Sequence, residues 1–455
     1  MANTTLIQPN PTATSPDTPE ISHQQAFDQV MGQFESQPDW LAERRAAAWE
    51  RFETLPFPQR KDERWRFSSF ERDPLADFRI GTGPDAATQA DLMDRSNMVV
   101  DHAGQLTFAD SVLIGKDPIS QDLQEAGVFF GTIEDALNEQ PELLKAFFLK
   151  DHADLGSEKV VALHEALVRS GSFIYVPDNV EVDKPLVVYH WLSQANASVF
   201  PHTLIVAGKH ARVNVVDVYV SDHLDTPGFA AAVGNIHAGA GSQVFRKVVQ
   251  NWNESILSFQ NDATVADRDA VVKNISVNIG ARRARAESQC RIIGPGAEVK
   301  MYALTVAEKE QEFDQRTLQI HAAPNAVSDL LFKNALMDTS RTIFSGLILV
   351  EENAQQTDAY QTNRNLLLDT TAEANSLPGL EIEANDVKCS HGATTSQLDS
   401  EDLFYLRSRG LHERTAKQLM VFGFFEEIIE KVENQELAEN LRKLVQSKFS
   451  SHSVA

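Results

Sequence analysis

The sequence predicts a mainly β protein with helices at both ends, and it favours a β-solenoid for the long central region. From about Phe173 onward, short runs rich in β-branched residues follow one another for over two hundred residues. Tight corners of small residues separate these runs at intervals of roughly thirty residues or multiples of that, a period typical of repeating architectures. No clear amphipathic helix longer than a turn or two interrupts the series. The corners are Gly208-Lys209-His210-Ala211, Gly239-Ala240-Gly241, Gly294-Pro295-Gly296 and Pro324-Asn325-Ala326.

Three architectures are compatible with strands at regular spacing and no intervening helices. These are a sandwich, an antiparallel barrel and a solenoid. The repeat lengths are unequal, and the Asn-Gly and Asp-Gly pairs that make tight hairpins are scarce. Both observations favour a solenoid, in which each coil stacks on the previous one. We expect this β core to occupy residues 161–398.

The region before the core is predicted to contain a tail and a mixed helical unit. Residues 1–20 are rich in Thr, Pro, Asn and Ser and lack the apolar block of a signal peptide, so we expect a disordered tail. Residues 21–160 should form the N-terminal helical and mixed region. Apolar spacings of three, four and seven predict helix over 22–53. Short strands are expected around 105–114, followed by a helix over 133–150.

The pattern becomes helical again at residues 399–455, which we expect to form a C-terminal helical domain. Ser400 is the expected helix cap, with two carboxylates in the first turn. Four aromatic residues are too many for so small a bundle to bury, so some should dock on the β core or on a partner. Those aromatics are Phe404, Tyr405, Phe422 and Phe425. The predicted apolar stripes contain Ala416, Leu419, Met420, Gly423, Phe424 and Ile428, and then Leu437, Leu441, Leu444 and Val445.

A cysteine and a histidine lie close together in the last β-like run. Residues 380–384 and 387–391 alternate in the period-two pattern of a strand. Because a strand places side chains i and i+2 on one face, Cys389 and His391 should point the same way, with Gly392 ending the strand. Thiol and imidazole groups bind iron, zinc or copper. Two ligands do not close a metal site, so further ligands would have to come from elsewhere.

A structural interpretation of the same pair stays open. Cysteine is among the most frequently buried residues, and a histidine at a strand end can simply form hydrogen bonds. Cys290 lies in another β-like run and is predicted to pack in the core. Arg282-Arg283-Ala284-Arg285 is interpreted as a solvated corner. The remaining histidines form no ligand pair and are predicted to be structural or on the surface, among them His164, His190, His202, His237 and His321.

Composition and missing motifs exclude several functions. The formal charge of −24 argues against a nucleic-acid partner, because binding to phosphates needs clustered Lys and Arg. Two cysteines among 455 residues are too few for a secreted disulfide framework, so a reducing, cytoplasmic setting is expected. No apolar run is long enough for a membrane helix. The sequence also lacks a phosphate-binding P-loop, a nucleophile elbow and a Cys-x-x-Cys pair, so we expect no enzyme activity.

Two motifs identify a family. Residues 387–394, Val-Lys-Cys-Ser-His-Gly-Ala-Thr, and residues 403–410, Leu-Phe-Tyr-Leu-Arg-Ser-Arg-Gly, closely resemble the SufD family. Residues 55–58 and 61–67 provide a second match, so the resemblance extends from about Phe27 to about Val432. This family supplies the cysteine-poor scaffold subunit of the Suf iron–sulfur cluster assembly machinery. The resemblance implies a right-handed parallel β-helix.

The resemblance also implies partners and ligands. A SufD-like chain pairs with SufB through the end of the β-helix, and its helical C-terminus receives the ATPase SufC. The family histidine implicated in cluster building corresponds to His391, and the case for Cys389 beside it is weaker. A transient cluster and reduced flavin are expected in the complex, with no stable cofactor on the isolated chain, which could also homodimerise. The residues expected to contact a partner are Phe404, Tyr405, Arg407, Arg409 and Gly410.

Three competing functions remain at this stage. A SufB-like cluster carrier is disfavoured by the 387–394 motif and by the presence of two cysteines. A β-helix enzyme acting on polysaccharides would need acidic residues clustered on one face. A purely structural adaptor would share the fold and would differ only in having no role for His391.

Overall fold

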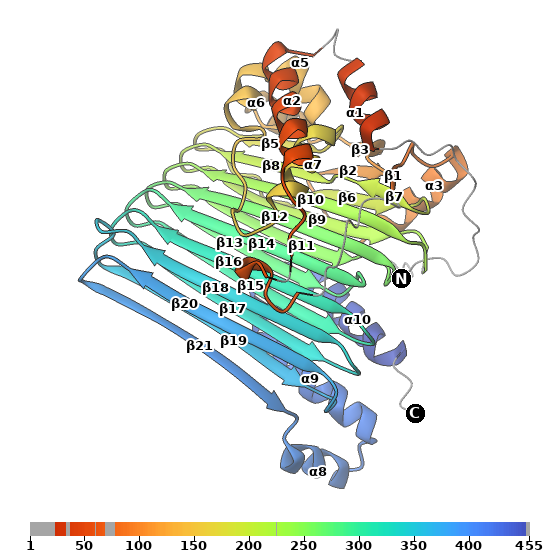
Figure 1. The fold of residues 1–455 in the computed structure, drawn as a ribbon, viewed down its shortest axis with the longest axis vertical. Coiled ribbons are helices and arrows are strands. Elements are labelled where there is room, and N and C mark those ends of the chain that lie inside the picture. The colour runs from red at the N-terminus through yellow and green to blue at the C-terminus, as the bar shows by residue number, and fades with distance from the viewer. Residues whose placement is uncertain (1–22, 33–36, 60, 69–77, 224, 452–455) are drawn as a thin grey trace.

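The computed structural model describes residues 23–32, 37–59, 61–68, 78–223 and 225–451. Its dominant feature is a parallel β-solenoid whose coils stack along the long axis of the molecule (Figure 1). Between β5 (Ser172–Val176) and β21 (Val387–Gln397) no described residue lies in a helix. The predictions of a mainly β protein and of a solenoid are therefore confirmed. The predicted disordered tail, residues 1–20, lies outside the described residues.

The solenoid consists of two sheets. Sheet one comprises β1 (Arg79–Ile80), β4 (Phe129–Thr132), β5, β7 (Ala197–Val199), β8 (His202–Ala207), β10 (Gly228–Ala238), β12 (Ile256–Ala266), β14 (Arg283–Ile292), β16 (Glu312–His321), β18 (Arg341–Val350) and β20 (Glu373–Ile382). Sheet two comprises β2 (Gly104–Ala109), β3 (Val112–Asp117), β6 (Leu186–Leu192), β9 (Arg212–Ser221), β11 (Gln243–Asn251), β13 (Val271–Asn278), β15 (Glu298–Ala307), β17 (Val327–Leu336), β19 (Thr357–Leu367) and β21. Even-numbered strands from β8 pair in one sheet and odd-numbered strands from β9 in the other, because the chain crosses between the sheets once in each half coil.

The predicted corners form a ladder along one edge of the solenoid. Register partners Arg212, Gln243 and Val271 lie 31 and 28 residues apart in sequence, which matches the expected period. Each coil has one residue with positive φ at this edge, and its amide donates to a carbonyl of the next coil. Glycine supplies this conformation at Gly241 and Gly296, where it avoids the steric cost of a Cβ. The whole series is Asn179, His210, Gly241, Asp269, Gly296, Asn325 and Gln356.

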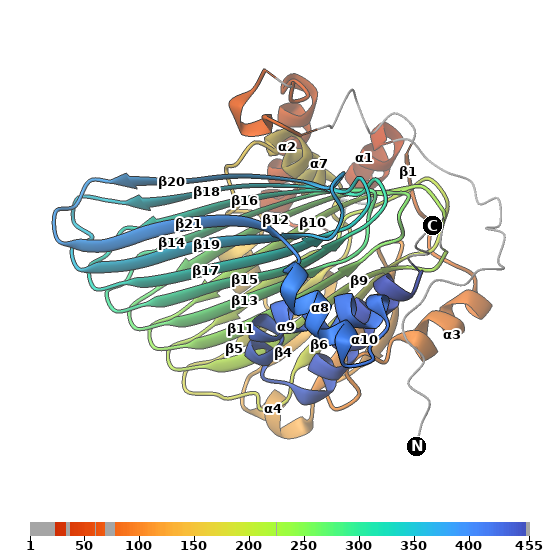
Figure 2. The ribbon, with the colours of Figure 1, turned by 90° about the horizontal axis from the view of Figure 1, so that it is seen from below.

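Helices of the N-terminal region flank the first coils of the solenoid (Figures 1 and 2). They are α1 (His23–Gly32), α2 (Asp39–Thr54), η2 (Glu63–Trp65), α3 (Ala86–Arg95), α4 (Gln121–Glu125), α5 (Ile133–Glu139), α6 (Pro141–Phe147) and α7 (Glu158–Leu167). The single helix expected over 133–150 is in fact two helices, because Gln140 has non-helical dihedrals and Pro141 starts α6. The strands expected around 105–114 are confirmed as β2 and β3.

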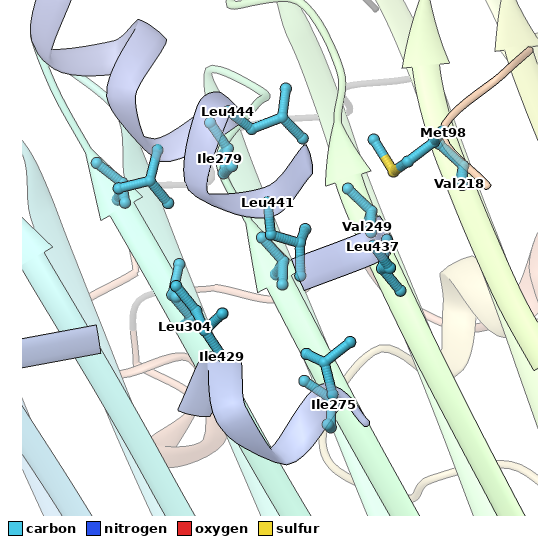
Figure 3. Packing of buried hydrophobic residues seen from close by; sticks show 14 of the residues in the cluster. Met98, Val218, Val249, Ile275, Ile279, Leu304, Ile429, Leu437, Leu441 and Leu444 are labelled. Carbon is cyan, nitrogen blue, oxygen red and sulfur yellow. The ribbon is translucent and has the colours of Figure 1, made fainter. Parts of the chain in front are cut away.

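Three helices at the C-terminus pack beside sheet two, on the other side of the solenoid (Figure 2). They are α8 (Ser400–Ser408), α9 (Glu413–Ile429) and α10 (Gln435–Ser451), with the short η3 (Glu430–Val432) between the last two. Figure 3 shows apolar side chains of this region, among them Ile429, Leu437 and Leu441, against strand residues such as Ile275 and Leu304.

Two details of the predicted C-terminal domain differ. The cap of α8 is Asp399, whose carboxylate accepts from the amides of Glu401 and Asp402, whereas Ser400 is the first helical residue. Leu419, expected in the apolar stripe, is 48% exposed. The buried side of α9 instead includes Val421 and Phe425, because these residues pack in the apolar cluster that α9 shares with sheet two.

Candidate functional site

The two ends of the solenoid are built differently, and the candidate site lies at the end formed by β20 and β21. Each of these strands pairs with a neighbour on one side only, β20 with β18 and β21 with β19. Among the described residues no element covers their free edges. The backbone groups along such an edge are available for pairing with another chain.

Cys389 and His391 lie in β21, as predicted, but not at its end. The strand continues past Gly392 to Gln397, so the expected strand end at Gly392 is wrong. Glycine does not stop the strand here because its backbone keeps the same parallel register with β19, pairing with Thr362. His391 is therefore a mid-strand residue on the free edge.

The register places both side chains in line with the solenoid interior. Cys389 pairs with Ala359 and His391 pairs with Gln361, and both β19 partners are fully buried. Register partners in parallel strands project to the same side, so the β21 side chains continue the interior column by one coil. No further coil covers them, which leaves His391 exposed and Cys389 partly buried.

The surroundings of the two groups differ. Cys389 packs against a small apolar cluster that includes Ile348, Ala359 and Ala384. Burial raises the pKa of the Cys389 thiol, so the thiolate form is disfavoured until a cation or metal is present. The imidazole of His391 forms no hydrogen bond with any described residue, and the ring is available to an incoming group.

The described residues do not complete a metal site around this pair. No three His, Cys, Asp or Glu side chains converge anywhere in the described part of the chain. Cys290 lies in β14, in the apolar interior far from β21 along the stack, and burial raises its pKa to about 12. The described residues at the open end therefore offer a thiol and an imidazole as candidate metal ligands.

The second predicted contact surface is α8. This helix has no buried residue, and Phe404 and Tyr405 are 74% and 55% exposed. Arg409 lies over the ring of Tyr405, and Arg407 forms an ion pair of 3.2 Å with Glu413 at the start of α9. An open hollow of about 720 Å³ lies beside them, lined by Phe404, Arg407, Ser408, Gly410, Leu411, His412 and Glu413. Of the four surplus aromatics, Phe425 is buried and Phe422 is partly buried, whereas Phe404 and Tyr405 project to solvent.

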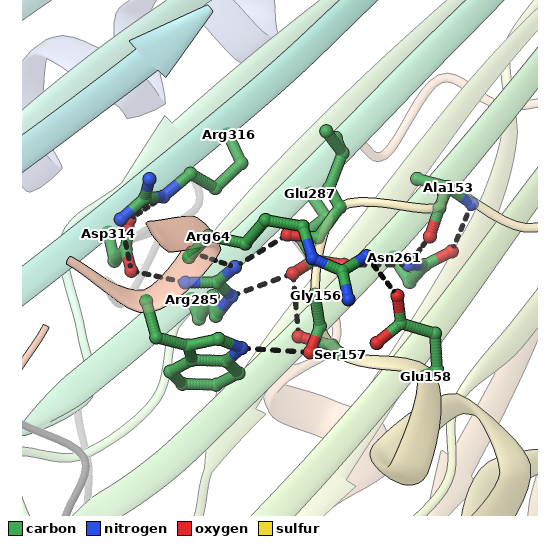
Figure 4. Close-up of polar contacts among 12 residues, drawn as sticks. Arg64, Ala153, Gly156, Ser157, Glu158, Asn261, Arg285, Glu287, Asp314 and Arg316 are labelled. Atoms are coloured by element: carbon green, nitrogen blue, oxygen red, sulfur yellow. Dashed lines mark hydrogen bonds and ion pairs between the residues drawn. The ribbon is translucent and has the colours of Figure 1, made fainter. Parts of the chain in front are cut away.

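A buried ionic network was missed by the sequence interpretation. Arg285, expected at a solvated corner, is fully buried, and it binds Glu287 at 2.7 Å and Asp314 at 2.5 Å. Its guanidinium also lies 3.8 Å from the centre of the Trp65 ring and donates to the carbonyl of Arg64 (Figure 4). The signal in the sequence is the alternation of charges at equivalent positions of successive repeats, because Arg285 pairs in register with Asp314, and Glu287 with Arg316.

This network explains the motif at residues 61–67. The indole of Trp65 donates to the carbonyl of Gly156 at 2.8 Å, and Ser157 donates to Glu287 at 2.7 Å. The first contact joins two N-terminal segments to each other, and the second ties them to β14 of sheet one (Figure 4). The motif therefore has a structural role in fastening the N-terminal region to the solenoid.

The described helices include none that is long and apolar enough to cross a membrane. Fold and site together define a helix-flanked parallel β-solenoid that carries a cysteine and a histidine at an uncovered end. Residues 190–424 match the family model described as "SUF system FeS cluster assembly, SufBD core domain", and residues 20–188 match the SufBD protein N-terminal region. The chain belongs to the SufBD family of the SUF system and has a role in iron–sulfur cluster assembly.

Several curated relatives support this assignment. The chain is 26% identical to the iron–sulfur cluster assembly protein SufD of Bacillus subtilis, over 94% of this chain and 98% of the relative. It is 26% identical to an iron–sulfur cluster assembly SufBD family protein of Staphylococcus epidermidis, over 87% and 86% of the two chains. A family member from Staphylococcus aureus is 28% identical over 68% of this chain and 66% of its own length.

Proposed function

We propose that this chain is a scaffold subunit without catalytic activity of its own, and that it builds a nascent iron–sulfur cluster jointly with a second subunit at the open end of the solenoid. The observation that carries the proposal is the uncovered last coil. In this coil β20 and β21 each have one unpaired edge, and β21 carries His391 and Cys389. By the family resemblance, the second subunit is SufB.

The chemistry at the open end suits shared ligation. A neutral imidazole binds iron through one ring nitrogen, and thiolates bind iron and sulfide. Because no three ligand side chains converge in the described part of this chain, a partner must supply the rest. Pairing of free edges with the strands of a similar solenoid would bring such a partner close to His391 through main-chain hydrogen bonds.

Replacing His391 tests this function. The His391→Ala chain, co-expressed with its partner subunits, should form the complex normally but build clusters far more slowly under anaerobic reconstitution, followed by ultraviolet-visible spectra. Cys389→Ala should cost less, and Cys290→Ala should leave cluster chemistry nearly unchanged. Ser390→Ala, on the opposite face of the same strand, is the matched control. A normal rate of cluster building in the His391→Ala complex would show that the histidine is structural and that the ligands belong wholly to the partner.

We further propose that α8 docks the ATPase subunit, which the resemblance identifies as SufC. The support is the exposure of Phe404 and Tyr405 beside an open hollow that Arg407 and Gly410 also line. Large exposed aromatics with an arginine nearby are typical of binding hot spots. Arg409, which stacks on Tyr405, would contribute to the same contact.

Point substitutions test docking better than deletion of the domain. Removing α9 and α10 would expose the apolar outer face of sheet two, so loss of binding could follow from misfolding. Phe404→Ala and Tyr405→Ala leave that core intact and should each weaken capture of SufC by about tenfold or more. Glu439→Ala, at an exposed position of α10, is the control. Unchanged capture by the Phe404→Ala, Tyr405→Ala double variant would refute this docking site.

Cofactor binding follows from the same proposal. The cluster is cargo that the complex holds transiently, and reduced flavin is expected to act only in the complex. The purified single chain should show no ATPase activity and no stable chromophore. Stoichiometric iron and sulfide on the isolated chain would contradict this.

A further inference from the structure

We propose that Gln361 positions His391 by accepting a hydrogen bond from its imidazole, so that the other ring nitrogen faces the open end as a ligand. The inference rests on the proposed ligand role of His391. The two residues are register partners in β19 and β21, and each has an unused polar group.

Gln361 lies in the interior directly below His391 in the stack. It is fully buried, and its amide nitrogen donates to the carbonyl of Gly346 across the interior at 3.3 Å. Its amide oxygen is also buried and has no hydrogen-bond partner in the described part of the chain. A buried acceptor without a donor costs about 1–3 kcal/mol, so this oxygen favours any donor that can reach it.

Gly346 creates the space that this amide occupies. A Cβ at position 346 would lie 2.6 Å from the Gln361 amide oxygen and 2.7 Å from the Thr317 hydroxyl. Any larger residue would push the amide away from this place. Because position 346 has no side chain, the amide of Gln361 can occupy this place in the interior. His391 is its register partner in the next strand, β21.

His391 is the side-chain donor that the register places next to Gln361 on the open side. Its imidazole forms no hydrogen bond with any described residue, and its side chain projects to the same side of the sheet as that of Gln361. Histidines that bind metals almost always donate their second ring N–H to a carbonyl or carboxylate oxygen, which fixes the tautomer and the ring orientation. Gln361 supplies such an oxygen from this chain.

The tautomer of His391 tests the inference without any cluster. Nitrogen chemical shifts of ¹⁵N-histidine-labelled full-length chain, at a pH where the ring is neutral, report the ratio of the two N–H tautomers. The His391→Asn chain identifies the signal. We expect the ratio of the major to the minor tautomer of His391 to be about fivefold larger in the wild-type chain than in Gln361→Met. This variant keeps the length of the side chain and removes the oxygen.

Two further variants make the result specific. Gln361→Glu retains an acceptor and should restore the wild-type tautomer preference. Gln319→Met removes an equally buried interior amide whose oxygen also lacks a partner among the described residues. The register partners of Gln319 in the following coils are Ile348 and Leu380, so this amide is not next to His391. This control should leave the His391 ratio unchanged. If Gln361→Met unfolds, Gln361→Leu provides the same comparison at a shorter length.

The outcomes separate this inference from the proposed function. An unchanged tautomer ratio in Gln361→Met and Gln361→Leu overturns the role of Gln361, whatever the complex does. A changed ratio, together with normal cluster building in the His391→Ala complex, supports the contact and refutes the ligand role. If the contact of Gln361 with His391 and the ligand role of His391 are both correct, Gln361→Met should slow cluster building in the complex. Gln361→Glu should then restore the rate.

Discussion

The first and last coils of the solenoid share one backbone geometry but differ in what covers them. Every residue of β2, near the first coils, is buried, whereas no residue of β21 is. At the first coils, the antiparallel strand β3 and the N-terminal helices complete the fold. At the last coil, the interior column simply ends at the surface. The difference teaches that strands with the same pairing can be fully buried or exposed, depending on whether another element covers them.

The largest effect should come from breaking the buried network that fastens the N-terminal region. Arg285→Ala leaves the carboxylate of Glu287 buried without its cation and removes one of the two arginines that bind Asp314, which should lower the free energy of unfolding by about 3–5 kcal/mol. Urea denaturation followed by circular dichroism measures this. Arg291→Ala is the control, because its ion pair with Glu351 is solvent-exposed and is expected to contribute at most about 1 kcal/mol. Equal losses for both variants would show that the buried network contributes no more to stability than an exposed ion pair of the same strand.

The reactivity of the two cysteines should show the difference between the covered coils and the open end. Burial raises the pKa of Cys290 to about 12, and its side chain is fully enclosed. Cys389 is partly exposed, so iodoacetamide should label it in the folded chain on the order of 100-fold faster than Cys290. Mass spectrometry of timed digests measures both rates, and labelling in urea should make them similar. Faster labelling of Cys290 in the native chain would show that the closed coils open readily.

A buried histidine should make the closed region sensitive to acid. His190 is stacked between Phe108 and Tyr219, with ring centres 5.2 and 5.3 Å away. Burial, and then the charge of Arg246, lower the pKa of His190 to about 3. In the unfolded chain the ordinary value is about 6.5, so the unfolded state binds more protons between these values, and stability is lost as pH falls through this window.

Replacing that histidine should reduce the acid sensitivity. Between pH 7 and pH 5, His190 alone should cost about 2 kcal/mol of unfolding free energy, and His190→Phe should remove that part of the slope. Urea titrations at both pH values provide the measurement. His412→Phe, at an exposed position, should keep the wild-type slope. An unchanged slope in His190→Phe would show that the ring is protonated without unfolding.

The smallest effect on stability should come from the candidate site itself. The His391 side chain is exposed and forms no hydrogen bond with any described residue, so His391→Ala should change the free energy of unfolding by less than about 0.5 kcal/mol. The same urea titration measures it. A loss above about 1.5 kcal/mol would mean that His391 supports the last coil, and the comparison of the two ends would then need revision.

The periodic features of the fold could be predicted from the sequence, because corners and strands depend on local residues. Gly241 and Gly296 have the positive φ that their corner positions require, and the coil length follows from their spacing. Contacts between coils could not be predicted in this way. Arg285 resembles a surface residue in its own segment, and its burial depends on Asp314 in the next coil and on Trp65 far away in the chain.

The candidate site shows the same limit. Its strand and the shared face of Cys389 and His391 follow from the period-two pattern, and the structure places both residues in β21. That Gly392 lies inside this strand, and that Gln361 lies below His391, depends on the register with β19. A register cannot be read from one segment, because it is set by the neighbouring coil.

The ladder of corners with positive φ also relates the number of coils to the length of the solenoid. Successive register partners lie between 26 and 32 residues apart, as Leu257 and Arg283, and Arg341 and Glu373, show. A coil adds about 4.8 Å along the axis, since that is the spacing of paired strands. Duplication or loss of one complete coil would therefore change the height of the open end in a fixed step and would keep every remaining corner in phase. A partner that bound both the open end and the C-terminal helices would then fit poorly, because the distance between these two surfaces would have changed.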